Sequence, residues 1–398
     1  MFLKSIRIRH YKSLADVQLL DLTPVTLLVG PNAVGKSNIV DGLRFLRDIV
    51  TDGLDHAVSK RGGIGVIRQY SPTKPYQISV AIEYSDAGEK AAAIGGNYEL
   101  TIASLTAGNF RVERETASWY EEFFAFEESK DTWLSQGLKQ HHFERSAGGE
   151  LSVDGQADKK HRLLPDQLAL GSRFMMGPIG RPILQLLSGF RFSALYPNTL
   201  REPSRPETDR TLKESGENWA SILKALKKSP RGREALERIL ETMRMVVPNL
   251  QDVTVRTVGG YLVPQFRVKN SPKAMHDFDP VQLSDGTLRI FGILLALYQI
   301  PAPFFIALEE PEQTVHPAIL ATLAEAFREV SERTQLLITS HSPHLVDFIR
   351  PEEIRVVSMK NGKTLVSPIK ATQTEAVKEQ LISLQELMTA EGLQPEDA

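Results

Sequence analysis

Residues 30–37 form the motif that most narrows what this chain can fold into. They read GPNAVGKS, which fits the P-loop pattern G-x-x-x-x-G-K-[S/T]. The apolar, β-branched run at 25–29 predicts a buried strand before the motif. After the motif, apolar residues recur at helical spacing: Ile39, Leu43, Leu46 and Val50. Glycines let such a loop point its N–H groups at phosphate oxygens, and the helix N-terminus adds partial positive charge. The sequence therefore predicts a strand, a phosphate-binding loop and a helix in succession.

This loop predicts a nucleotide site. Lys36 would reach the β- and γ-phosphates, and the Ser37 hydroxyl would be a ligand of Mg²⁺. The residues expected to bind the nucleotide here are Gly30, Asn32, Gly35, Lys36, Ser37 and Asn38.

Composition excludes several other classes of protein. The chain has 398 residues, enough for two or three domain-sized units or for one domain with a large insertion. It has no cysteine, which excludes disulfides, zinc ribbons and thiol catalysis. The longest apolar run, 290–300, stops at Pro301 and is too short to span a membrane. The N-terminus alternates like a strand and lacks a signal peptide's apolar core. We expect a soluble cytoplasmic protein with no membrane partner.

The charge balance bears on nucleic-acid binding. Net charge is −2, from 47 basic and 49 acidic residues, whereas a dedicated DNA binder usually has a basic excess. Contact with DNA would need a local patch or a partner. One basic cluster lies in the predicted helical region at 210–247, either as a solvated helix face or as a phosphate-contacting patch: Lys224, Lys227, Lys228, Arg231 and Arg233.

Four segments are expected along the chain. Residues 1–112 are an N-terminal ATPase lobe that carries the P-loop, a strand at 77–84 and a hairpin at 100–112. Residues 113–250 are an insertion, polar and irregular over 113–175 and then helical. Residues 251–370 form a C-terminal lobe, and 371–398 form a docking helix and tail with Leu381, Leu384, Leu387 and Met388 at helical spacing.

The C-terminal lobe supplies candidates for hydrolysis, which needs an acidic residue for Mg²⁺ and a group that activates water. The predicted strand at 304–308 ends in Glu309 and Glu310, and we expect it beside the P-loop strand. Glu309 would hold the Mg²⁺ shell, and Glu310 would be the general base. The next predicted strand, 335–339, leads to His341, which can reach the γ-phosphate and sense its loss.

A further motif, LSDGTLR at 283–289, opens the apolar helix that follows. Ser284 and the backbone of Gly286 lie where a helix N-terminus offers donors to an anion. Taken alone, this is an ordinary helix N-cap.

The order GPNAVGKSN, LSDGTLRI, FFIALEEPE, TSHSP resembles that of ABC-type ATPase heads in the RecF, SMC and OLD-like branch, whose stand-alone members are grouped as AAA family ATPases. The opening strand with its Tyr-Lys-Ser turn at 11–13 is also similar to this group, as are the segments YPNTLR at 196–201 and SGENWA at 215–220. The fold that the resemblance implies is α/β: a P-loop NTPase of the ABC-head type with a mixed sheet, an antiparallel β region and a helical or irregular insertion.

The resemblance also implies a mechanism. ATP and Mg²⁺ are the expected cofactors. Ser284 and Gly286 would act in trans, contacting the γ-phosphate bound to another subunit, so that two ATPs are sandwiched in a homodimer. Hydrolysis at Glu310 would let the dimer open.

Three functions follow from the family. Stand-alone members resemble ATPase subunits of bacterial anti-phage systems, which work with a separately encoded effector such as a nuclease or toxin. A RecF- or SMC-like DNA-repair ATPase that clamps duplex DNA is the alternative, and a nucleotide-binding scaffold without turnover is a third.

The sequence departs from the family pattern in places. Glu309 stands where many ABC heads have aspartate, and we expect neither a long coiled coil nor a Toprim nuclease domain. Gln69 is a candidate for the glutamine loop. Arg61 and Arg68 are either phosphate-reaching or structural.

Overall fold

The computed structural model describes the chain apart from residues 70–76, 86–94, 128–131, 173–179, 272–273 and 397–398. The chain divides into two compact units, and each is described by itself. Unit 1 comprises Met1–Leu22, Ala33–Phe190 and Val357–Val366; unit 2 comprises Thr23–Asn32, Arg191–Val356 and Ser367–Ala398.

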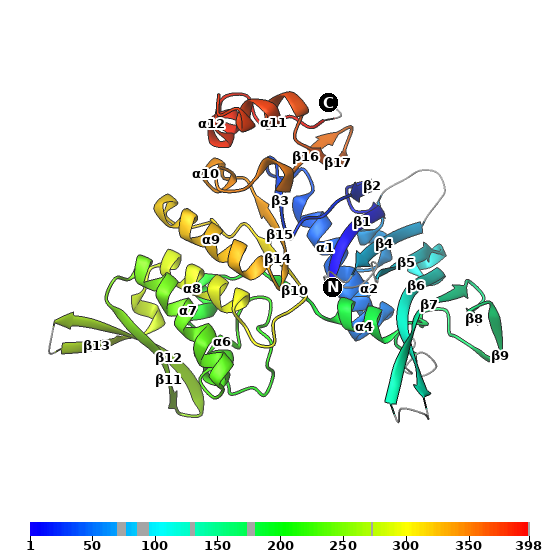
Figure 1. Ribbon diagram of the computed structural model, residues 1–398, viewed down its shortest axis with the longest axis horizontal. Helices are drawn as coiled ribbons and strands as arrows, with labels where there is room; N and C mark the ends of the chain where they lie inside the picture. Colours follow the sequence, from blue (N-terminus) through cyan, green and yellow to red (C-terminus); the bar gives the residue numbers. More distant parts are fainter. Residues whose placement is uncertain (70–76, 86–94, 128–131, 173–179, 272–273, 397–398) are drawn as a thin grey trace. The chain divides into compact units, whose positions relative to one another are not determined.

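Unit 1 is built on an eight-stranded sheet with the order β2-β1-β4-β5-β6-β7-β8-β9, whose neighbouring strands are antiparallel (Figure 1). The strands are β1 (Phe2–Tyr11), β2 (Leu14–Leu19), β4 (Gln77–Ser85), β5 (Gly95–Ser104), β6 (Phe110–Glu127), β7 (Thr132–Ser146), β8 (Glu150–Val153) and β9 (Gln156–Arg162). The predicted strand at 77–84 and the hairpin around residues 106–109 are confirmed.

The expectation of an irregular segment at 113–175 is wrong, because β6 to β9 occupy most of its described part. Along β6 the side chains of Glu115, Ala117 and Trp119 all lie at buried positions with polar residues between them. The alternation typical of a strand is therefore present. Because Glu115 occupies one of the inward-facing positions of β6, the hydrophobicity of the sequence alone does not reveal this alternation.

The first helix of unit 1 begins inside the P-loop motif, at Lys36. The helices of this unit are α1 (Lys36–Asp52), α2 (Leu54–Ser59), α3 (Ile64–Ile67) and α4 (Arg181–Ser188). Of the apolar stripe predicted for α1, Ile39, Leu43 and Leu46 are buried, and Ile49 rather than Val50 completes it. This stripe packs α1 against the sheet of unit 1.

A second sheet has the strand order β10-β14-β15-β3-β16-β17, and its strands β14, β15 and β3 lie in unit 2. The strands are β10 (Phe190–Ser193), β14 (Phe305–Glu309), β15 (Gln335–Ser340), β3 (Val25–Val29) and β16 (Ile354–Lys360), which leads into β17 (Lys363–Pro368). The pairs β14–β15, β15–β3 and β3–β16 are parallel. The prediction that β14 lies beside the P-loop strand is wrong, because β15 lies between them. These strands are buried on both faces, so their sequences carry no signal of their order.

Helices and a small sheet complete unit 2. The helices are α5 (Pro197–Arg201), α6 (Trp219–Leu226), α7 (Pro230–Val246), α8 (Asp285–Leu297), α9 (Leu320–Ser331), α10 (Pro343–Val346), α11 (Ala371–Lys378) and α12 (Leu384–Ala390). The predicted helical region at 210–247 is thus two helices, and Ser229 caps the second by accepting from the Gly232 N–H at 3.0 Å. Strands β11 (Leu250–Val258), β12 (Tyr261–Ser271) and β13 (Ala274–Phe278) form a three-stranded sheet.

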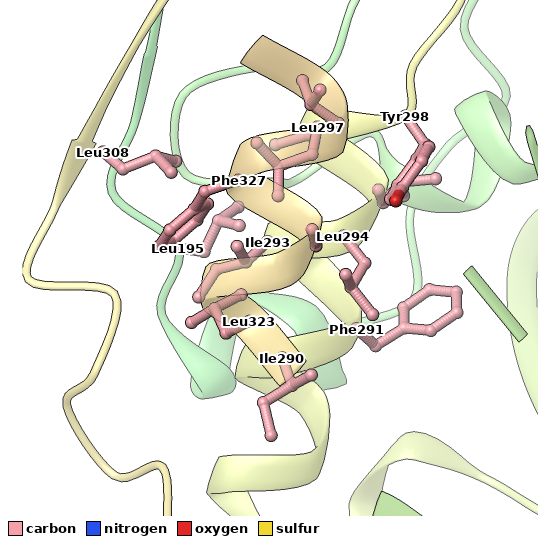
Figure 2. Close-up of a cluster of buried hydrophobic side chains, with 14 of the residues drawn as sticks. Leu195, Ile290, Phe291, Ile293, Leu294, Leu297, Tyr298, Leu308, Leu323 and Phe327 are labelled. Atoms are coloured by element: carbon pink, nitrogen blue, oxygen red, sulfur yellow. The ribbon is translucent and has the colours of Figure 1, made fainter. Parts of the chain in front are cut away.

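Helix α8 is the centre of the core of unit 2. Every residue from Leu288 to Leu297 is buried, and Figure 2 shows the side chains of Ile290, Ile293 and Leu297 among those of neighbouring elements. Burying one such side chain contributes about 1.5–3 kcal/mol. The predicted apolar helix is confirmed, and its position is set by this packing.

The C-terminal segment contains two short helices where one was predicted. Leu384 and Leu387 are buried as expected, whereas Leu381 lies between α11 and α12 and is 74% exposed. Within the described residues, none of the helices combines the length and the apolar character needed to cross a bilayer.

A buried polar cluster joins the sheet of unit 1 to the loop around residue 169. The Glu115 carboxylate accepts from the N–H groups of Ala169 at 2.6 Å and Leu170 at 2.9 Å, and from the Tyr98 hydroxyl at 3.0 Å. Arg145 is also fully buried and donates to the carbonyls of the same loop at 164 and 165. Burial raises the pKa of Glu115 to about 7, against the lowering effect of these partners.

The raised pKa of Glu115 predicts a pH-dependent stability. Between pH 4.5 and about 7, the Glu115 side chain is protonated in the folded protein but ionised in the unfolded chain, where its pKa has the ordinary value of 4.5. The free energy of unfolding should therefore fall by about 3 kcal/mol as pH rises from 4.5 to above 7. Glu115→Gln should remove this part of the slope in urea titrations between pH 5 and 8. Glu113→Gln, two residues earlier on β6, is the matched control, and an equal loss of slope in both variants would contradict the assignment.

Candidate active site

The P-loop enters α1 through Gly35, which has a φ of 107°. An added Cβ at Gly35 would overlap the Thr364 hydroxyl and lie 2.8 Å from the Ser13 Oγ. Only glycine fits here, because both the backbone conformation and the close approach of two side chains exclude a larger residue.

A chain of hydrogen bonds clamps this part of the loop. The Asn38 amide donates to Ser13 Oγ at 2.8 Å, Ser13 Oγ lies 2.7 Å from Thr364 Oγ1, and the Thr364 hydroxyl donates to the Val34 carbonyl at 2.8 Å. Because each hydroxyl has one proton to donate, the hydrogen bonds all point one way: Asn38 donates to Ser13, Ser13 to Thr364, and Thr364 to the Val34 carbonyl. Ser13 follows β1, and Thr364 lies on β17 near the other end of the sequence. The P-loop pattern includes neither residue, although Ser13 lies in the Tyr-Lys-Ser turn that is similar to the family.

The N-terminus of α1 suits an anion. Within the described residues, no side chain caps it, and its first turn contains no acidic residue. Lys36 is buried and Ser37 is exposed, so the hydroxyl that would bind Mg²⁺ is accessible. Backbone N–H groups and a positive helix end are the donors that phosphate groups use.

In unit 2, the C-terminal ends of three parallel strands lie at one sheet edge. Glu309 is in register with Thr339, and Ser340 is in register with Val29. Gly30, Glu310 and His341 each follow directly after these ends. The structure therefore brings the first residue of the P-loop together with the predicted acidic residues and histidine.

The Glu310 side chain has two polar neighbours. Its Oε1 lies 3.4 Å from His341 Nδ1, and its Oε2 accepts from the Gln313 amide. The side chains of Glu310 and His341 are 23% and 42% exposed, so both can reach a substrate. Glu310 has a φ of 46°, and its N–H donates to the Thr339 carbonyl at 3.0 Å. The carboxylate is thus presented by a left-handed residue directly after the strand.

Glu312 connects this turn to the end of β15. Its Oε1 accepts from the Ser340 hydroxyl at 2.6 Å and from the His341 N–H at 3.2 Å. Its Oε2 is buried and has no partner among the described residues. Sequence reasoning assigned no role to Glu312 or Gln313, although both lie in the EEPEQ stretch that carried the acidic motif.

The oxygen donors at this sheet edge fit a Mg²⁺ ion that is bound partly by the protein and partly by the phosphates of a nucleotide. The described residues contain no cluster of three His, Asp or Glu side chains able to hold a metal alone. Mg²⁺ in nucleotide sites is bound through one or two carboxylates plus substrate phosphates and water. Glu309 and the unused oxygen of Glu312 supply oxygen donors of that kind.

Helix α8 begins as predicted. Ser284 caps it by accepting from the Thr287 N–H at 3.2 Å, and its side chain is exposed. A Cβ at Gly286 would lie 2.5 Å from the Thr314 carbonyl oxygen, so only glycine allows the first turn to approach the 310–315 turn this closely. Arg201, from the YPNTLR segment, donates to the Leu283 carbonyl at 2.9 Å and supports the entry to the helix.

Other candidates have local roles. Arg61 pairs with Asp41 and Asp48, and its guanidinium lies 5.1 Å from the Phe45 ring centre, so the structural interpretation is confirmed. The Gln69 N–H donates to the carbonyl of His10. Its role as the glutamine loop stays a prediction.

Comparison with known proteins decides the family. A family model described as "AAA domain, putative AbiEii toxin, Type IV TA system" matches residues 25–347. The chain belongs to this AAA domain family. The matched span of this AAA domain contains the P-loop, the LSDGTLR motif, the EEPE motif and His341.

Two curated relatives of this AAA domain match over part of their length. The DNA replication and repair protein RecF of Thermosynechococcus vestitus is 34% identical over 68 residues, which are 14% of this chain and 18% of RecF. The chromosome partition protein Smc of Mycobacterium tuberculosis is 34% identical over 128 residues, 30% of this chain and 9% of Smc. The chain therefore spans less than a fifth of each of these relatives.

Solved structures confirm the fold. An Smc head bound to the C-winged helix domain of ScpA has a TM-score of 0.55 and 12% identity, covering 94% of this chain and 99% of that one. A second solved structure is an Smc head with an extended coiled coil, bound to the C-terminal domain of ScpA derived from Pyrococcus furiosus. It has a TM-score of 0.54 and 12% identity, and the match covers 96% of this chain and 99% of that one. The AAA domain has the P-loop NTPase fold of ABC-type heads, and its sequence is similar to parts of RecF and Smc.

The clamp on the P-loop predicts a phenotype for Thr364→Val. The substitution keeps the side-chain shape but leaves the buried Val34 carbonyl without its donor, which costs about 1–3 kcal/mol. We expect a lower free energy of unfolding and about tenfold weaker ATP binding, measured by urea titration and calorimetry. Thr51→Val, at an exposed position on α1, is the control. Equal ATP affinity of the two variants would contradict a role for the clamp.

Proposed function

We propose that the protein is an ATP-hydrolysing, dimeric switch whose nucleotide state controls a separate effector. The observation that carries the proposal is the sheet edge in unit 2, where Gly30, Glu310 and His341 follow the aligned ends of parallel strands. Glutamate beside histidine after such a strand is suited to activating water next to a bound phosphate.

In the proposed reaction, the P-loop N–H groups and Lys36 hold the phosphates. Glu310 accepts a proton from the attacking water. His341, within 3.4 Å of Glu310, contacts the γ-phosphate and registers its loss. Gln313 orients the second carboxylate oxygen of Glu310 by donating to it.

A magnesium ion would be held by Ser37 and by Glu309, directly or through water, and would neutralise charge on the phosphates. The exposed hydroxyl of Ser37 and the oxygen-rich 309–312 turn support this assignment.

The proposed switch is a homodimer in which Ser284 and Gly286 of one subunit contact ATP held by the other. The exposure of Ser284 at the start of α8 supports this, because the residue is open to a second molecule. The effector is proposed to be a separately encoded nuclease or toxin of an anti-phage system. The family description, which names a toxin and a type IV toxin–antitoxin system, supports that class.

One observation keeps DNA clamping as a second candidate. In the basic cluster of α6 and α7, Lys227 pairs with Asp252 and Arg233 donates to the Lys227 carbonyl. The side chains of Lys224, Lys228 and Arg231 are exposed, and within the described residues they have no hydrogen-bond or ion-pair partner. Free cations on one surface can contact phosphates, and such binding would be strongly salt-dependent.

The role of Glu310 is tested by Glu310→Gln. Losing a general base should lower kcat about 10²–10⁴-fold while ATP binding is retained. The variant should therefore accumulate as the ATP-bound dimer, seen as a doubling of mass in light scattering with Mg-ATP. Lys36→Ala, which should lose ATP binding, is the control.

Two outcomes would contradict this assignment. Turnover by Glu310→Gln at the wild-type rate would exclude it as the base, and a mass that does not respond to ATP would exclude the gated dimer. Doubling that requires duplex DNA, in a salt-sensitive manner, would favour the clamp over the effector switch.

The trans contact is tested by Ser284→Arg. A bulky cation at this exposed position should block the approach of a second subunit without changing the P-loop. We expect ATP affinity within about twofold of wild type by calorimetry. In the Glu310→Gln background, where the ATP-bound dimer should accumulate, we expect no ATP-dependent doubling of mass. Unchanged dimerisation would exclude the contact.

A further inference from the structure

Arg289 is a buried arginine on α8, and within the described residues its guanidinium donates only to backbone carbonyls. It is 5% exposed. Its Nη1 donates to the Leu195 carbonyl at 2.7 Å, and its Nη2 donates to the carbonyls of Glu310 at 2.9 Å and Glu309 at 3.3 Å. The cation therefore contacts the main chain of Glu309, the last residue of β14, and of Glu310, which follows it.

These carbonyls belong to a strained part of the backbone. Glu310 has a φ of 46°, a conformation that costs a residue with a Cβ about 1–2 kcal/mol. Such a residue keeps its conformation only when its surroundings hold it. Here the N–H of Glu310 donates to Thr339 and its carbonyl accepts from Arg289, so the backbone of this residue is held on both sides.

The same helix touches this turn a second time. Its first turn approaches the Thr314 carbonyl at Gly286, and Arg289 follows three residues later. The apolar cluster in Figure 2 fixes the helix, because Leu195 and Leu308 pack in it with residues of α8. The start of α8 and the 309–315 turn are thus connected by two independent contacts.

We propose that Arg289 is a positioning residue for Glu310 and couples its orientation to the start of α8. This rests on the proposed function, in which Glu310 is the base and Ser284 contacts ATP on a second subunit. A shift of the helix start on engaging that ATP would be passed through Arg289 to the peptide of Glu310. Catalysis at one site would then depend on whether the opposite site is occupied.

The alternative is a purely structural arginine, and the chain contains a matched example. Arg355 is 7% exposed and also donates to two carbonyls, those of Glu352 at 2.7 Å and Ile354 at 3.1 Å. Both of these carbonyls lie outside the 309–315 turn. Loss of its hydrogen bonds should affect stability and leave the hydrolysis step unchanged.

The test compares Arg289→Lys with Arg355→Lys in the full-length protein. Lysine keeps the charge, but its single ammonium does not have the forked donors that bind Leu195 and Glu310 together. We expect Arg289→Lys to lower kcat at least tenfold with ATP affinity within about twofold, since small displacements of a catalytic group have large effects. Arg289→Lys and Arg355→Lys should lower the Tm by similar amounts. Arg355→Lys should nevertheless leave kcat within about twofold of wild type.

A double variant separates positioning from general damage. In the Glu310→Gln background, Arg289→Lys should cause no further fall in kcat, because residues that act as a unit are not additive. Arg289→Gln, which removes the buried charge, is the second variant and should show the same pattern if the lysine variant does not fold.

Three results would overturn the inference: normal kcat in the Arg289 variants, equal kcat losses at Arg289 and Arg355, or a full additional loss in the double variant. Failure of the proposed function is distinguishable, because wild-type protein would then hydrolyse no ATP, or Glu310→Gln would retain full activity.

Discussion

The register of three buried parallel strands is the constraint on which the candidate active site depends. Glu309 is paired with Thr339 and Ser340 with Val29, so the polar residues that follow each strand meet at one edge of the sheet. Parallel sheets place such residues together because the carboxyl ends of all their strands point the same way. The apolar packing around α8 holds these strands, so the core of unit 2 determines where the chemistry can occur.

The turn after β14 has a fixed conformation because its polar groups are held from several directions. Glu312 is bound by the end of β15, Gln313 donates to Glu310, and Arg289 holds the carbonyls. Such pre-organisation is what general-base catalysis requires, since a carboxylate must be aligned before water attacks. Left-handed backbone at Glu310 stores strain that these contacts compensate.

The part of the P-loop that lies in unit 1 depends on residues distant in sequence. Ser13 and Thr364 are separated by 351 positions, yet their hydroxyls lie 2.7 Å apart next to Gly35. Neither belongs to the P-loop motif. Their hydrogen bonds explain how a short glycine-containing loop keeps a defined shape in this chain, because each buried polar group has a partner.

The sequence by itself determined the P-loop, the apolar strands, the helix opened by Ser284 and the acidic and histidine residues, because each depends on local spacing that a fold element imposes on its own residues. Only the tertiary structure decided that β15 lies between β14 and β3, that residues 113–162 contain strands, and that Arg289, Gln313, Ser13 and Thr364 support the site. Strand order in a buried sheet leaves no pattern along the chain, a buried glutamate interrupts the alternation of β6, and hydrogen bonds between distant residues arise only when the chain has folded.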